Sequence, residues 1–158
     1  VLQQKPQARL LLCGQGENFE QSQQEAKALG IAEMVLFSGN VNRPEDYLQA
    51  MDVFVMTSLF EGLPIVGVEA QASGLPCIFA DTITQEVKIL PQTQFLALTQ
   101  PDEAWAERIV QTKPMERSLA GHCVESAGFA EENLDRQVCA LYGMEEHHFA
   151  NISGRDHL

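Results

Sequence analysis

The sequence predicts an α/β protein with a doubly wound parallel sheet and helices on both of its faces. Short apolar runs, such as residues 8–13 and 77–80, alternate with longer segments of mixed polarity. Largely apolar runs of this length are typical of strands that lie inside a parallel sheet, covered on both faces. Strands that alternate with helices favour right-handed crossover connections, which place helices over the sheet. The 158 residues suffice for one domain of this Rossmann-like class.

Glycine, proline and helix-capping residues divide the first part of the chain into elements. Asn18 is a predicted N-cap, and Gly30 is predicted to end the helix that follows it. Pro44 suits the first turn of a second helix, because an N–H at that position would have no helical partner. The elements predicted in this part are strands at 8–13, 33–38 and 53–56 and helices at 18–29 and 43–51.

The second part of the chain continues this alternation and then becomes helical. A helix is predicted to follow the strand at 53–56 and to end at Gly74, before strands at 77–80 and 94–98. Further helices are predicted at 102–112, 115–127 and 130–142. Residues 1–142 form one predicted domain, whereas the polar stretch at 143–158 has no periodicity and is expected to be disordered.

Composition excludes several classes of function. The net charge is −12, from 22 acidic and 10 basic residues, which argues against nonspecific binding to nucleic acid or to an anionic membrane. No apolar run approaches the roughly 20 residues of a membrane span, and no signal peptide is visible. The four cysteines form no C-x-x-C pair, which predicts reduced thiols in a cytosolic protein. The four histidines show no ligand spacing with them, so no metal site is predicted.

Ligands of a doubly wound sheet bind at the carboxyl ends of its strands, so the loops after the predicted strands are candidate sites. Gly14-Gln15-Gly16 is half of a dinucleotide-binding fingerprint, without the third glycine or the distant acidic residue. A nicotinamide-dependent enzyme is therefore disfavoured, and a tight turn is the competing interpretation of these glycines. Gly14 and Gly16 are kept as candidate ligand contacts, as is Thr82 in the polar loop at 81–86.

The strongest functional signal is the stretch at 58–70, where a strand breaks into a Gly/Pro turn and a helix follows. The N–H groups and the positive end of such a helix suit a phosphate or another anion. Glu61 and Glu69 bracket the turn, Gly62 permits close approach of a ligand, and Pro64 suits the first helical turn. Glu69 follows Gly62 by seven residues, about two helical turns, which predicts a shared helix face.

An anion-attracting turn between two carboxylates suggests a ligand that is part phosphate and part polyol. In this interpretation Glu69 accepts two hydrogen bonds from ribose hydroxyls, and Glu61 does the same for a hexose. The competing interpretation makes Glu61 an acid that stabilises the helix N-terminus and Glu69 a solvated surface acid.

Several segments around this turn match one known family. Residues 35–39 and 51–55 precede the turn and residues 67–77 follow it, while Glu61 and Glu69 have the spacing of an E-x7-E signature. With these motifs, the stretch from Leu10 to Phe95 resembles the nucleotide-sugar-binding half of retaining glycosyltransferases of the GT-B fold. Residues 67–77 are similar to the bacterial branch of that group, which builds capsular polysaccharides and exopolysaccharides.

The resemblance implies a role for each matching residue. Glu61 would be the catalytic residue that contacts hydroxyls of the donor sugar, and Glu69 would hold the ribose hydroxyls. The backbone of the turn between them would face the sugar and the diphosphate, and the main chain at 39–41 would recognise the base. The implied donor-binding residues are Gly39, Asn40, Val41, Glu61, Gly62, Leu63, Pro64 and Glu69.

The resemblance further implies a hexosyltransferase with a nucleotide-sugar donor, expected to be UDP-linked, and no required cofactor or metal. Residues 1–142 would be its C-terminal donor domain, truncated at its start and inactive alone. The acceptor would bind an N-terminal domain of the same protein that this chain lacks. The expected location is cytoplasmic, with the whole enzyme peripheral at the inner face of the membrane and acting on a lipid-linked acceptor.

Two departures from the family pattern stand out. The loop at 81–86 lacks the Gly-Gly pair that the family often has there, and no Lys or Arg occurs between Arg43 and Lys88. The Arg and Lys that the family uses come from a strand and loop upstream of the matching region. Two alternatives are a nucleotide-sugar epimerase of the same fold, although its histidine-containing catalytic loops are not apparent, and a non-catalytic nucleotide-binding module.

Overall fold

The structure, a computed structural model, describes residues 1–129 and confirms the α/β class, with parallel strands and flanking helices. The helix predicted at 130–142 and the stretch at 143–158 lie outside the described residues. The strands are β1 (Leu10–Cys13), β2 (Val35–Gly39), β3 (Phe54–Met56), β4 (Cys77–Ala80) and β5 (Gln94–Leu96). The helices are α1 (Phe19–Ala28), α2 (Pro44–Gln49), α3 (Ile65–Ala72), α4 (Asp102–Gln111) and α5 (Arg117–Val124). Shorter 3-10 turns occupy Ala32–Met34 and Gln85–Val87, and a π-helical turn occupies Glu125–Phe129.

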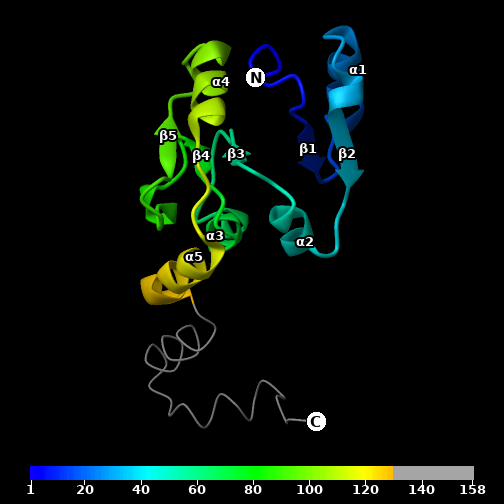
Figure 1. Ribbon diagram of the computed structural model, residues 1–158. Coiled ribbons are helices and arrows are strands. Elements are labelled where there is room, and N and C mark those ends of the chain that lie inside the picture. The colour runs from blue at the N-terminus through cyan, green and yellow to red at the C-terminus, as the bar shows by residue number, and fades with distance from the viewer. Residues whose placement is uncertain (130–158) are drawn as a thin grey trace.

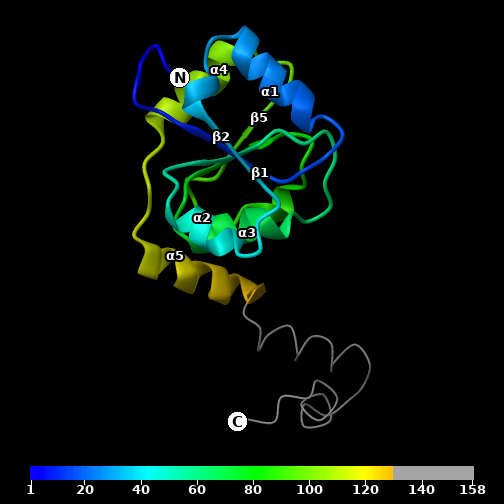
Figure 2. The same cartoon turned by 90° about the vertical axis from the view of Figure 1, so that its right-hand side faces the viewer.

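The strands form two parallel sheets instead of one continuous sheet. β1 pairs with β2, and β3, β4 and β5 pair in that order. The two sheets stand beside each other and are linked by α2 and the chain that follows it (Figure 1). In the view of Figure 2, α1 and α4 lie on one side of the strands and α2 and α3 on the other. The predicted placement of helices on both faces is therefore confirmed.

The buried core lies in the second sheet and in the helices beneath it. Every residue of β4 is buried, and the ring of Phe79 lies 6.2 Å from that of Phe54 and 5.8 Å from that of Phe95. α3 packs directly on this strand, because a Cβ on Gly67 would come within 2.9 Å of the Phe79 ring. Helix and strand approach this closely only where the helix residue has no side chain.

The N-terminal strand differs from its prediction. The run at 8–13 was expected to be covered on both faces, yet Leu10 and Leu12 are 50% and 38% exposed and Cys13 is also exposed. Within the described residues β1 pairs with β2 alone, whereas β4 lies between two strands and has α3 packed on its face at Phe79. The prediction of burial is therefore wrong for β1 and correct for β4.

The C-terminal helix α5 is fastened over the end of α3. Gly74 ends α3 with a φ of +77°, and its carbonyl accepts a hydrogen bond of 3.1 Å from the N–H of Met115. The Arg117 guanidinium donates to the Gln49 carbonyl at 2.7 Å and also to the side-chain oxygen of Gln49. These contacts hold Met115 outside the helix, so α5 begins two residues later than predicted.

None of the helices in residues 1–129 combines the length and hydropathy that a bilayer crossing requires.

Cysteine reactivity tests this distribution of burial. Burial raises the pKa of the Cys77 thiol to about 12, so it stays protonated and inaccessible at pH 8, whereas Cys13 is exposed. Iodoacetamide at pH 8 is expected to alkylate Cys77 at least about 10-fold more slowly than Cys13, as followed by peptide mass spectrometry. In urea the two rates should converge, and equal rates in the native protein would contradict the burial of β4.

Candidate functional site

The candidate site begins where β3 ends and the chain turns into α3. Pro64 is extended, with φ −75° and ψ 104°, and α3 starts at the next residue. The N–H groups of Gly67 and Val68 both donate to the Pro64 carbonyl, at 2.9 and 3.3 Å. No side chain caps this end of the helix. The first N–H groups of α3 have no acceptor carbonyl within the helix. They are therefore available to an anion that lies above the carboxyl end of β3.

Glu61 is held by the neighbouring loop. Its backbone forms an isolated parallel bridge with Ile83, which is buried, and the Glu61 residue is itself half-buried. Nearby, the Thr82 hydroxyl donates to the Ser58 carbonyl at 2.7 Å. The loops that follow β3 and β4 are therefore joined, and Thr82, a sequence-predicted candidate, takes part in joining them.

Glu69 lies on the exposed side of α3. The predicted helix face shared with Gly62 is wrong, because α3 begins at Ile65 and leaves Gly62 in the preceding turn. The extended conformation of Pro64 is the reason, since it separates the turn from the helix. Glu69 instead follows Ile65 by four residues, and both side chains are exposed on one face of the helix. Glu61 and Glu69 thus flank the start of α3, as predicted, but from a turn and a helix and not from a single helix face.

The glycines of the first sheet form a second, separate cluster. The Gly14 N–H donates to the Gly39 carbonyl at 2.7 Å, and φ is +120° at Gly14 and +66° at Gly39. The Gln15 side chain covers Gly39, where a Cβ would lie 3.2 Å from its amide nitrogen. A tight turn thus accounts for both Gly14 and Gly39. Asn40, Val41 and Gly16 border this cluster, of which Asn40 and Gly16 are exposed.

The two clusters are not hydrogen-bonded to each other. Within residues 1–129, no hydrogen bond joins the loops at 14–17 and 39–43 to the loops at 57–64 and 81–86. Leu63 and Gly62 are exposed beside Glu61, and Pro64 is buried at the start of α3. The residues predicted to hold the sugar and the diphosphate therefore lie in one cluster. The residues predicted to recognise the base lie in the other.

Gln71 is a residue that the sequence analysis missed. Its amide is fully buried on α3 and donates to the carbonyls of Gly67, at 3.0 Å, and Val87, at 2.7 Å. Its oxygen accepts hydrogen bonds from the N–H groups of Ile89 and Leu90 and from the Thr93 hydroxyl, at 2.8 to 3.0 Å. One side chain thus fastens residues 87–93 to the helix that carries Glu69. The available signal in the sequence was an amide on the otherwise apolar buried face of this helix.

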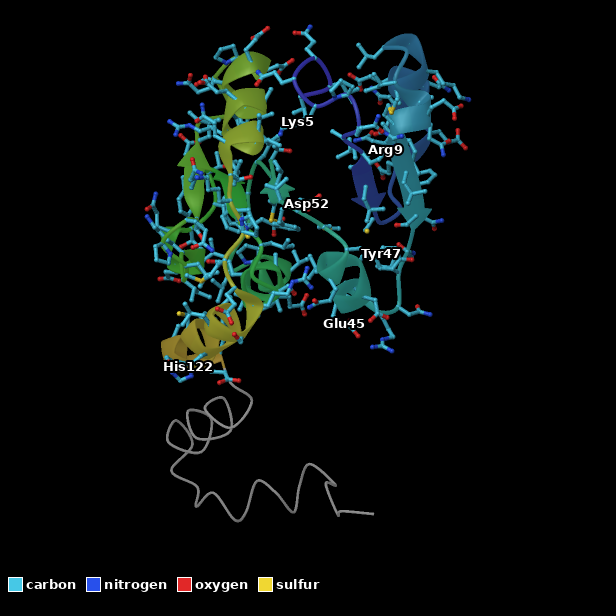
Figure 3. All side chains as sticks on the ribbon, in the orientation of Figure 1. Lys5, Arg9, Glu45, Tyr47, Asp52 and His122 are labelled. Carbon is cyan, nitrogen blue, oxygen red and sulfur yellow. The ribbon has the colours of Figure 1, made fainter. Side chains whose placement is uncertain are left out.

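The charge around the site is acidic. The loops at 57–64 and 81–86 contain no Lys or Arg. Arg43 pairs with Glu45 at 3.0 Å and with Asp46 at 3.2 Å, all on exposed side chains. A hydrogen bond from its own backbone and the pairing with Arg43 lower the pKa of Glu45. Figure 3 shows Glu45 on α2, whereas Lys5 and Arg9 lie on the segment that leads into β1.

The amino-acid sequence of the chain is similar to those of known glycosyltransferases. The profile of the family described as glycosyl transferases group 1 matches residues 1–121. The protein EpsF of Bacillus subtilis (strain 168), named as a glycosyltransferase, is 44% identical over 104 residues, which are 65% of this chain and 27% of EpsF. The Vi polysaccharide biosynthesis protein VipC/TviE of Salmonella typhi is 35% identical over 141 residues, 84% of this chain and 24% of that protein. The chain therefore spans about a quarter of the length of these relatives.

Solved structures give the same fold. The apo form of the lipopolysaccharide outer core galactosyltransferase WaaB superimposes with a TM-score of 0.67 at 21% identity, covering 85% of this chain and 40% of that one. WaaG, a glycosyltransferase involved in lipopolysaccharide biosynthesis, gives a TM-score of 0.57 at 19% identity, covering 75% and 32%. Both are glycosyltransferase structures, and the α/β fold of this chain matches each of them.

The role of Gln71 predicts a large loss of stability on its replacement. Gln71→Leu keeps the size of the side chain but removes the hydrogen-bond partner of two N–H groups, of the Thr93 hydroxyl and of the Val87 carbonyl. We expect the free energy of unfolding to fall by about 3 kcal/mol or more. The midpoint of urea unfolding measures this, with Gln24→Leu on the exposed side of α1 as the control. A Gln71→Leu protein as stable as the control would show that these hydrogen bonds are dispensable.

Proposed function

Because this chain belongs to the glycosyl transferases group 1 family, we propose that it is the donor-binding domain of a retaining glycosyltransferase. The observation that carries this proposal is the start of α3. There, uncapped N–H groups at the carboxyl end of β3 lie between two acids, Glu61 and Glu69. Such a turn offers hydrogen-bond donors to a diphosphate and acceptors to sugar hydroxyls within a few residues.

Each residue takes the role that its position suits. Glu61, fixed by its bridge to Ile83, accepts hydrogen bonds from hydroxyls of the donor sugar and acts as the catalytic carboxylate. The backbone of Gly62, Leu63 and Pro64 faces the sugar and the diphosphate. Glu69 accepts hydrogen bonds from the two ribose hydroxyls. No metal or cofactor is required for these contacts.

The base contacts belong to the first sheet. The main chain at Gly39, Asn40 and Val41 recognises the base, next to the Gly14 turn that is hydrogen-bonded to Gly39. In the described structure this cluster is separate from the α3 cluster, so a nucleotide that touches both must bridge the two sheets. We propose a UDP-linked hexose as the donor, and the lipopolysaccharide 1,6-galactosyltransferases among the relatives are consistent with a hexosyl donor.

In the whole enzyme, the bond between the sugar and the diphosphate breaks, and a new bond to an acceptor hydroxyl forms with net retention. The nucleoside diphosphate leaves with the electron pair of the broken bond, and its departing oxygen takes up the proton that the acceptor hydroxyl loses. An N-terminal domain of the same protein would bind the acceptor. The Vi polysaccharide relative supports a role in polysaccharide biosynthesis, for which we propose a lipid-linked acceptor at the cytoplasmic face of the membrane.

Nucleotide titration tests the donor site directly. UDP, GDP, ADP and CDP are added to the chain and binding is followed by NMR, with UDP expected to bind most tightly. Glu69→Ala should weaken UDP binding about 10-fold or more, since it removes two charge-assisted hydrogen bonds of roughly 1 kcal/mol or more each. Glu103→Ala on α4 is the control, because Glu103 is also exposed and lies in the first turn of its helix. Equal affinity in Glu69→Ala and the control would refute the ribose role.

The isolated chain is expected to bind a nucleotide weakly and to transfer no sugar. The physical reason is charge: helix N-termini offset only part of a leaving diphosphate, and the loops of the site contain no cation. To measure transfer, the chain is incubated with UDP-glucose or UDP-galactose and a crude lipid acceptor fraction. The released UDP is then quantified. Sugar transfer by residues 1–158 alone would overturn the assignment of the chemistry to a larger protein.

A further inference from the structure

The turn that carries Glu61 has almost no packing of its own. Leu59 and Phe60, the two residues before Glu61, are 80% and 84% exposed, the highest values among the large apolar side chains of residues 1–129. Gly62 follows, and a Cβ added to it would meet no atom within 4 Å. Apolar side chains fix a turn only where they pack against other groups. The backbone around Glu61 must therefore be held by polar contacts.

These polar contacts come from the loop that follows β4. The Thr82 hydroxyl donates to the Ser58 carbonyl at 2.7 Å, three residues ahead of Glu61. The backbone of Glu61 itself forms the parallel bridge with Ile83. Apart from this bridge, the Thr82 bond is the only hydrogen bond that reaches residues 58–62 in the part of the chain that the structure describes. Two adjacent residues of one loop thus hold both ends of the segment that leads to Glu61.

The loop that provides these contacts is anchored in the core. Ile83 is 1% exposed, and its N–H donates to the Ala80 carbonyl at 3.1 Å. The Asp81 N–H donates to the Leu96 carbonyl of β5, also at 3.1 Å. The loop is therefore the fixed partner, and the turn at 58–62 takes its position from the loop.

The Thr82 hydroxyl has one proton, and the Ser58 carbonyl already accepts it. Thr82 could donate to a phosphate or to a sugar oxygen only by giving up this bond. A Gly-Gly pair, which the family often has in this loop, could not form the bond, because glycine has no hydroxyl. The departure of residues 81–86 from the family pattern thus supplies a contact that the turn around Glu61 uses.

We propose that Thr82 is a positioning residue, whose bond to Ser58 holds the Glu61 carboxylate at the donor sugar, and that Thr82 does not itself touch the donor. This role rests on the proposed function, in which Glu61 accepts hydrogen bonds from hydroxyls of the sugar. Hydrogen bonds weaken steeply as the two atoms move apart or out of line, so a small displacement of the turn is enough to weaken these contacts.

The effect is confined to the sugar half of the donor. Glu69, the proposed ribose contact, lies on α3. That helix is held by its packing on Phe79 and by the Gln71 hydrogen bonds, neither of which involves Thr82. Loss of the Thr82 bond therefore weakens the binding of the hexose and leaves the binding of the nucleotide unchanged.

Relative affinity tests this role. The chain is titrated by NMR with UDP and with UDP-glucose and UDP-galactose, and the affinity for the tighter-binding sugar nucleotide is divided by the affinity for UDP. Thr82→Val keeps the size of the side chain but removes the hydroxyl. We expect it to lower this ratio about 3-fold or more, with the affinity for UDP unchanged.

Two further variants serve as controls. Thr82→Ser keeps the hydroxyl and should restore the ratio. Thr112→Val removes a hydroxyl of the same kind away from the site, because the Thr112 hydroxyl donates to the Ile109 carbonyl at 2.8 Å just after α4. This variant should leave the ratio unchanged.

A double-mutant cycle separates positioning from direct contact. Glu61→Gln should lower the ratio about 5-fold or more, since it replaces charge-assisted hydrogen bonds by neutral ones. Adding Thr82→Val to Glu61→Gln should lower the ratio no further, because Thr82 acts through Glu61. A Thr82 side chain that touched the sugar directly would instead give two losses that add.

The contrary results differ in what they overturn. An unchanged ratio in Thr82→Val beside a lowered ratio in Glu61→Gln refutes the positioning role and leaves the proposed function intact. Additive losses refute it in favour of a direct contact, and a weaker affinity of Thr82→Val for UDP refutes the confinement to the sugar. An unchanged ratio in Glu61→Gln overturns the positioning role together with the proposed sugar contact of Glu61.

Discussion

The close approach of α3 to β4 is the contact on which the candidate site depends. Gly67 lets the helix lie directly on the Phe79 ring, and the Gln71 amide fastens the same helix to residues 87–93. Together these contacts fix the position of α3 against β4, and therefore where its free N-terminal N–H groups lie. Glu61 and Glu69 then take their positions from this helix and from the bridge to Ile83. A buried glycine and a buried amide, neither of which faces the ligand, thus set the geometry of the residues that do.

The loops of the candidate site contain carboxylates and backbone N–H groups but no Lys or Arg. The turn at 57–64 offers hydrogen-bond donors from the backbone and two carboxylates, which suits hydroxyls and a phosphate held by N–H groups. A departing diphosphate requires more positive charge than a helix N-terminus supplies. The cation nearest in sequence before the site, Arg43, is already paired with Glu45 and Asp46. This distribution of charge agrees with the role that we propose for the chain, a donor domain of a larger protein.

Strands β1 and β4 have similar apolar compositions but differ in burial. Leu-Leu-Leu-Cys and Cys-Ile-Phe-Ala predict the same kind of strand, and both form parallel strands. Only the second lies between two partners, and only the second is buried. α3 packs on β4 at Phe79, so the burial of a strand depends on the elements that cover its faces and not on its composition alone.

The sequence by itself determined the α/β class, the order of the strands and helices and the turn that carries Glu61, because these depend on local periodicity and on glycine and proline. Gly30 and Pro44 marked helix limits correctly for the same reason. Tertiary structure alone decided that β1 is exposed, that Gly62 and Glu69 lie on different elements, and that Gln71 links α3 to residues 87–93. Each of these depends on contacts between residues distant in the chain, or on the extended backbone of Pro64, which no periodicity records. A candidate site could therefore be proposed from sequence, but which of its residues lie together could not.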